Sequence, residues 1–67
     1  MACPACGQAT LRAAGKDEVC SNCGWQDDPA SRDDETATSQ ENGLSLRQAR
    51  WNVEQFSLAF PPSEVGV

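Results

Sequence analysis

Four cysteines are the residues of this 67-residue chain whose type and spacing indicate chemistry. They form two Cys-x-x-Cys-Gly units, the segments CPACG at 3–7 and CSNCG at 20–24. A Cys-x-x-Cys turn lets two thiolates from one tight loop face the same point, and two such turns complete the tetrahedral sulfur shell that Zn²⁺ favours. We therefore expect one structural zinc ion, with the ligands Cys3, Cys6, Cys20 and Cys23.

The residues that surround the cysteines favour a closed metal site. Gly7 and Gly24 each follow the second ligand of a turn, where the backbone often needs a positive φ and glycine has no steric penalty. The sequence has no histidine, so the site is most simply built from all four thiolates. A filled shell leaves no position for an activated water. We expect no enzymatic activity, since no pairing of nucleophile and base is visible.

Three other uses of the cysteines stay open at this point. Iron in the same cage would make a rubredoxin-like electron carrier, although zinc has the higher intrinsic affinity. A reactive dithiol of the thioredoxin kind needs one pair only and a βαβ context. Disulfides are rare in reducing compartments. We expect a cytoplasmic protein, because no apolar run suffices to span a bilayer and no segment is typical of a secretory signal.

The charge balance limits the partners. Ten acidic residues against five basic ones give a net charge of −5. Affinity for phosphate backbones depends on clustered Lys and Arg, so nucleic acid is a disfavoured partner. A nucleic-acid-associated zinc ribbon remains an alternative function, and its basic patch would consist of Arg12, Lys16, Arg47 and Arg50. A protein with a basic surface is favoured electrostatically.

Three zones must position these residues. Residues 1–28 hold both cysteine pairs, and we predict a zinc ribbon there. Its short hairpin pairs residues 8–12 with 17–19 around Gly15, and a third strand covers 25–27. We expect the small core of the ribbon to be formed by Leu11, Val19 and Trp25.

The remaining zones predict a connector and a helix. Residues 29–43 contain nothing more apolar than alanine, which predicts an acidic flexible connector. Residues 44–60 predict an amphipathic helix that packs on the ribbon, with Ser45 as N-cap and Gln48 completing a capping box. Two prolines then stop the helix, and residues 61–67 form a tail. The fold class is a small α+β domain with one C-terminal helix, whose apolar stripe is Leu46, Ala49, Val53, Phe56 and Phe60.

The order and spacing of these segments resemble a known family. The strings CPACGQATL, EVCSNCGWQDDP and NGLSLRQARWNVEQF are similar to the CPCC family of small cysteine-rich bacterial proteins, over residues 3–29 and 42–56. Ala5 stands where the name-giving motif has a third, adjacent cysteine, and Ser21 stands where a second proline is usual. The first departure disfavours a redox role that uses adjacent thiols. The resemblance implies, for some members, interaction roles such as the neutralisation of a toxin.

Two carboxylates follow the second cysteine pair. Asp27 and Asp28 could support acid–base chemistry or bind a hard cation, but neighbours on an extended segment point to opposite faces. We favour a capping role before Pro29, or an ion pair from one of them to Arg50.

One tryptophan lies off the apolar stripe. At about 100° per residue, Trp51 falls on the opposite side of the predicted helix, with Leu58 beside it. Such a pair is a candidate partner contact, while packing against the connector or tail, or self-association through this Trp51 face, remains open. We therefore predict a non-catalytic, zinc-stabilised protein-binding module for a basic partner such as a toxin. Its candidate contact residues are Trp51, Leu58, Asp27, Asp28 and Arg50.

Overall fold

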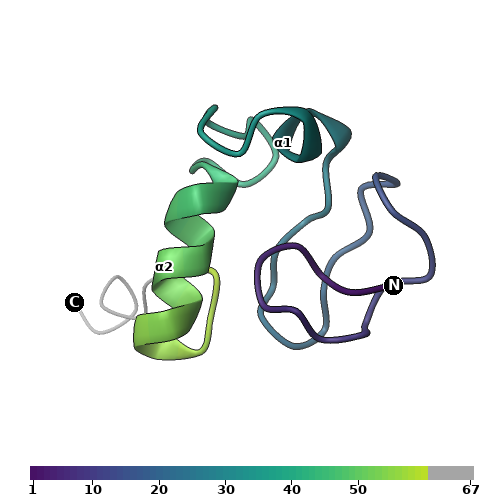
Figure 1. The fold of residues 1–67 in the computed structure, drawn as a ribbon, viewed down its shortest axis with the longest axis horizontal. Coiled ribbons are helices and arrows are strands. Elements are labelled where there is room, and N and C mark those ends of the chain that lie inside the picture. Colours follow the sequence, from purple (N-terminus) through teal and green to yellow (C-terminus); the bar gives the residue numbers. More distant parts are fainter. Residues whose placement is uncertain (61–67) are drawn as a thin grey trace.

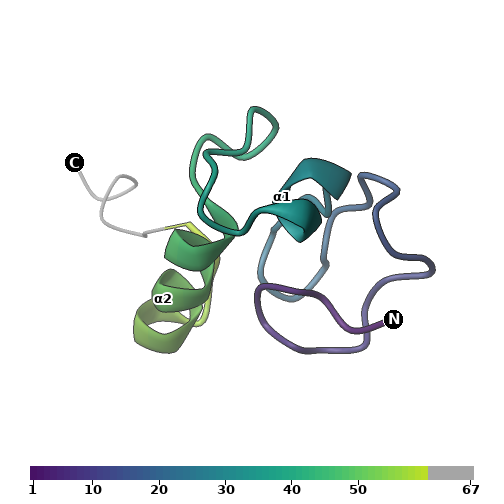
Figure 2. The same ribbon diagram turned by 45° about the horizontal axis from the view of Figure 1, so that its top comes forward.

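The structure is a computed structural model that describes residues 1–60 (Figure 1). Its helices are α1, Pro29–Asp33, and α2, Leu46–Phe56. The loops that precede α1 lie along one side of α2, and α1 lies at one end of both (Figures 1 and 2). No helix of this part of the chain has the length and apolar character that crossing a membrane requires. The predicted tail, 61–67, lies outside the described residues.

The predicted three-stranded sheet is not found between residues 1 and 60. An isolated antiparallel bridge joins Val19 to Gln26, and a second bridge lies further along the chain. The pairing predicted around Gly15 is not seen in this part of the chain; instead the chain reverses at its Cys-x-x-Cys turns, and the flanks of each turn pair with each other. Leu11 and Trp25 are buried as predicted, whereas Val19 is 58% exposed and lies outside the core.

The segment predicted as a flexible connector contains α1 and two buried serines. The helix begins because the Asp28 carboxylate accepts a hydrogen bond from the Ser31 N–H at 2.7 Å, and Pro29 follows the cap. Further along, the Ser39 hydroxyl donates to the same carboxylate. Hydrogen bonds to one buried acid therefore order a segment that has nothing more apolar than alanine to bury.

The predicted α2 is present but shorter. Ser45 caps it by accepting a hydrogen bond from the Gln48 N–H at 3.1 Å, which confirms the N-cap. The Gln48 side chain donates to Asn52 at 3.0 Å, so it is used within the helix and not for the reciprocal half of a capping box. The helix ends at Phe56 and not near residue 60, because Ser57 adopts a left-handed conformation with φ 64°.

The core is built around the cysteines. Leu46 and Ala49 of α2 pack in the same buried cluster as Trp25 and the cysteine loops. After α2 the chain turns back, and the Ala59 N–H donates to the Cys23 carbonyl at 3.0 Å. Phe56, which was predicted to lie in the apolar stripe, is instead 40% exposed, because the chain leaves the helix at that position. The hydrogen bond from Ala59 joins the loop that contains Cys20 and Cys23 directly to the segment that follows α2.

Candidate metal centre

Two nearly identical turns present the cysteines. We call residues 3–7 the first cysteine turn and residues 20–24 the second. The glycine that closes each turn has a positive φ, 82° at Gly7 and 88° at Gly24, which confirms the prediction for both. The turns repeat one hydrogen-bond pattern, namely Cys3 N to Gln8 O and Gly7 N to Cys3 O, both 2.8 Å, then Cys20 N to Trp25 O, 2.8 Å, and Gly24 N to Cys20 O, 2.9 Å.

The four cysteine sulfurs have the spacing of a tetrahedral metal shell. All four Sγ atoms lie within 4.8 Å of one another. The Cys3–Cys23 and Cys6–Cys20 sulfur pairs, each of which joins the two turns, are 3.7 Å apart. Four sulfurs at about 2.3 Å from a central zinc ion would be about 3.8 Å apart. All four cysteines are free thiols, so the structure brings together every predicted ligand in a form that could bind a metal ion.

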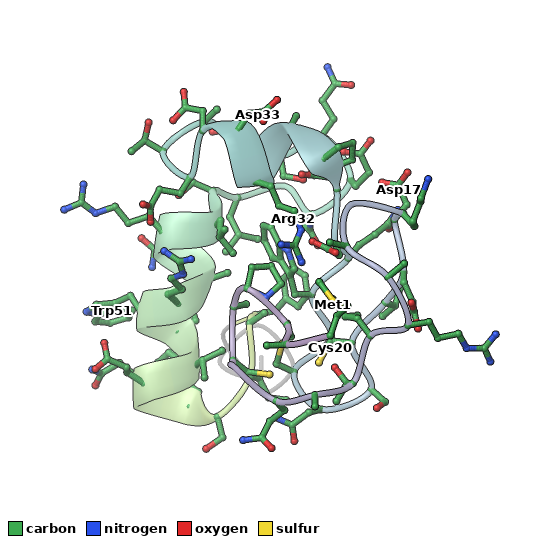
Figure 3. The ribbon with its side chains drawn as sticks, turned by 45° about the vertical axis from the view of Figure 1, so that its right-hand side comes forward. Met1, Asp17, Cys20, Arg32, Asp33 and Trp51 are labelled. Carbon is green, nitrogen blue, oxygen red and sulfur yellow. The ribbon has the colours of Figure 1, made fainter. Side chains whose placement is uncertain are left out.

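The surroundings of the four sulfurs are unequal. Cys3, Cys20 and Cys23 are buried, whereas Cys6 is partly exposed. The Thr10 hydroxyl donates a hydrogen bond to the Cys20 sulfur at 3.0 Å. No sequence pattern singles out Thr10, because this contact joins two loops that lie side by side only in the folded chain. Figure 3 shows Cys20 between the loops.

These surroundings shift the thiol pKa values in opposite directions. Burial raises the pKa of Cys3 and of Cys23 above the ordinary value of 9.0. Burial acts in the same direction at Cys20, but hydrogen bonds, first that from Thr10, outweigh it and lower the pKa to about 6. A divalent cation would favour ionisation of the remaining thiols.

The two carboxylates after the second turn serve the fold. Asp27 is fully buried and accepts hydrogen bonds from Arg32 Nε at 2.7 Å and Nη2 at 2.9 Å. Figure 3 shows Arg32 pointing from α1 toward the loops. Arg50 instead donates to the Pro4 carbonyl at 2.8 Å and forms an ion pair with Glu35. The predicted ion pair from Asp27 or Asp28 to Arg50 is therefore wrong, because α1 places Arg32 beside the first carboxylate.

Asp28 has the predicted capping role. Its carboxylate accepts hydrogen bonds from the Ser31 N–H and from the Ser39 hydroxyl, and the residue is 2% exposed. Burial by itself would raise the pKa of Asp28, but the hydrogen bonds from Ser39 and Ser31 outweigh it and hold the pKa below its ordinary value of 3.8. Both carboxylates are thus buried and hydrogen-bonded inside the fold.

Trp51 lies on the outer side of α2. Its side chain is 52% exposed, and Figure 3 shows it pointing away from the cysteine loops. The Phe56 ring meets it edge to face, with 6.1 Å between ring centroids. Leu58 is 43% exposed. The chain therefore presents large apolar side chains to solvent, among them Phe56, a member of the predicted apolar stripe.

Comparison with known proteins places the chain in a family. A search of curated proteins gives no match. The sequence profile of the family described as Cysteine-rich CPCC matches residues 1–62. This range covers both cysteine turns, α1 and α2. The chain therefore belongs to the cysteine-rich CPCC family.

Proposed function

We propose that the protein is a non-catalytic protein-binding domain whose fold is held together by one zinc ion. The observation that carries the metal part is the set of four sulfurs, drawn from two turns and spaced for a tetrahedral ion inside the core. Four protein thiolates fill the shell of zinc and leave no position for a water ligand, which supports a structural role. Structural zinc contributes about 10–16 kcal/mol of apparent binding free energy in small peptides, more than so small a core supplies.

Zinc is favoured over iron on intrinsic affinity. Thiolate sites bind Zn²⁺ more tightly than Fe²⁺, and both ions accept four sulfur ligands in a tetrahedron. The alternative, a rubredoxin-like electron carrier, predicts a coloured protein that takes up and releases an electron. Metal analysis of the purified protein separates the two.

Charge and exposed aromatic area support a basic protein partner. The net charge of −5 attracts a basic surface and disfavours phosphate backbones. Arg32 and Arg50 form ion pairs with carboxylates of the same chain, which further weakens the case for nucleic acid. Trp51 borders a surface groove of about 410 Å³ and is half exposed, and tryptophan is enriched at the energetic centres of interfaces. A basic toxin is one partner of this class.

Affinity purification with the zinc-loaded protein tests the proposal. We expect a basic protein to be retained, and its measured Kd to rise at higher salt because exposed charges are screened. Trp51→Ser is expected to weaken binding by about thirtyfold, the equivalent of about 2 kcal/mol at an interface centre. Gln40→Ser changes an exposed residue in the segment between the helices and is the matched control. Equal binding by both variants, or retention of nucleic acid alone, would contradict the proposal.

A further inference from the structure

The two cysteine turns differ in one hydrogen-bond donor. In each turn, backbone N–H groups two and three residues further on face the first cysteine sulfur, Cys3 or Cys20. At Cys20 these donors are Asn22 N at 3.4 Å and Cys23 N at 3.5 Å. Only the second turn adds a side-chain donor, the Thr10 hydroxyl at 3.0 Å. Within residues 1–60, no other cysteine sulfur accepts a hydrogen bond from a hydroxyl group.

The backbone holds Thr10 in place for this contact. The Thr10 N–H donates to the Gln8 carbonyl at 2.9 Å. The next residue, Leu11, is buried and pairs with Met1, donating from its N–H at 3.1 Å and accepting from the terminal amine at 2.6 Å. The hydroxyl is therefore held next to Cys20 by a segment that is itself anchored in the core. The hydrogen bond to Cys20 then costs little additional conformational entropy.

A hydrogen bond to a thiolate withdraws negative charge from the sulfur. Hydrogen bonds to charged acceptors are stronger than hydrogen bonds between neutral groups. Groups that donate hydrogen bonds to metal ligands tune both the metal affinity of the site and the reactivity of the ligands. Cys20 has three donors and is 1% exposed. Cys6 is the opposite case, since it is the partly exposed member of the set, and within residues 1–60 its sulfur has one polar contact, the Cys20 sulfur at 3.7 Å.

We propose that Thr10 is a positioning residue of the metal centre: its hydroxyl makes Cys20 the least nucleophilic ligand and directs electrophiles to Cys6. The inference rests on the proposed metal binding. With iodoacetamide, the Cys6 thiolate sulfur forms a bond to the methylene carbon while the carbon–iodine bond breaks and iodide leaves with the electron pair. The resulting thioether is a neutral and weaker ligand than a thiolate, so modification at Cys6 opens the site.

Three variants of the zinc-loaded protein test this role. Thr10→Val keeps the size and removes the hydroxyl, Thr10→Ser restores the hydroxyl, and Thr38→Val makes the same chemical change at an exposed position. We expect Thr10→Val to bind zinc 10- to 100-fold more weakly in competition with a chelator, the usual effect of losing a group that supports a ligand. With Co²⁺ bound in place of zinc, the sulfur-to-metal charge-transfer band of the Thr10→Val variant should move to lower energy than that of the wild type. Thr10→Ser and Thr38→Val should match the wild type in both measurements.

The wild-type protein supplies a test that needs no variant. Mass mapping after limited treatment with iodoacetamide should find the first modification on Cys6 and the last on Cys20. Wild-type protein that binds no Zn²⁺ or Co²⁺ would refute the proposed function itself. A wild-type protein that loads with metal but is modified first at Cys20 would overturn the inference about Thr10 alone, as would a metal-loaded Thr10→Val variant that equals Thr38→Val.

Discussion

Replacing the buried carboxylate of Asp27 is expected to destabilise the zinc-loaded protein by about 3 kcal/mol. The substitution Asp27→Asn keeps the size of the side chain and one acceptor oxygen, but it removes the charge that faces Arg32. The side chain of Asp27 is completely buried, whereas that of Arg32 is 30% exposed. Breaking the ion pair therefore costs the buried Asp27 more interaction free energy than it costs the partly exposed Arg32.

The magnitude follows from the three hydrogen bonds that end on this carboxylate. Two come from Arg32, at 2.7 and 2.9 Å, and the third comes from the Gly15 N–H at 2.8 Å. Hydrogen bonds to a charged group contribute about 1.5–3 kcal/mol each, which gives an upper limit of about 9 kcal/mol. The exposed part of Arg32 regains water, and asparagine still accepts one bond. These two effects bring the expected loss to the lower end of the 3–5 kcal/mol typical of a broken buried pair.

A double-mutant cycle measures the interaction by itself. Urea unfolding of Asp27→Asn, Arg32→Met and the double variant, at one fixed concentration of free zinc, should give a coupling free energy of about 2 kcal/mol. The parallel cycle with Arg50→Met is the control, and it should give a coupling near zero because Arg50 contacts Pro4 and Glu35. Additive losses in the Arg32 cycle, or strong coupling in the Arg50 cycle, would refute the assignment of the ion pair.

Four further substitutions test local features. The carboxylate of Asp28 has a depressed pKa in the folded protein, so it contributes stability above pH 3.8, and this contribution is lost as the pH falls through the lower folded pKa. The stability advantage of the wild type over Asp28→Asn should therefore narrow only below about pH 4. This comparison is made on the Cd²⁺-loaded proteins, because soft thiolate ligands bind Cd²⁺ well. Ser57→Gly should raise the unfolding free energy by about 0.5–1 kcal/mol, since Ser57 has φ 64°; no gain in urea unfolding would contradict this. Gly7→Ala and Gly24→Ala should each cost about 1–2 kcal/mol through positive φ alone, because an added Cβ meets nothing closer than 3.6 Å at either position; a much larger loss at one of them would point to packing instead.

The two cysteine turns and the start of α2 could be predicted because each is encoded by a short stretch of sequence. A Cys-x-x-Cys-Gly unit specifies its own turn, so the two glycines with positive φ and the cluster of four thiols follow from spacing. Ser45 caps α2 through a contact that spans three residues. Within each turn and at the helix cap, the interacting groups are close in the sequence. The two turns themselves meet through the Cys3–Cys23 and Cys6–Cys20 sulfur pairs, which are 20 and 14 residues apart. That meeting could be predicted because a tetrahedral metal shell requires four ligands and the chain has four cysteines and no histidine.

The features that were missed depend on contacts between distant segments. A pattern of charges does not say whether Asp27 meets Arg32 or Arg50, because the answer depends on where α1 lies. That helix is short and has no apolar stripe. It is held by hydrogen bonds to the buried carboxylate of Asp28 and not by a hydrophobic face. The contact from Thr10 to Cys20 likewise joins two loops. Phe56 fits the helical apolar period, yet it is exposed because the helix ends beside it.

The most direct test of the central claim is the metal content of the folded protein and its order after the metal is removed. Native mass spectrometry should find one zinc ion per chain, and exhaustive chelation should abolish the helical circular dichroism of α2, because the cysteines form much of the core. Re-addition of zinc should restore it. Chelated protein that keeps its helical signal, or a metal-free mass that reveals two disulfides in place of four thiols, would contradict the account.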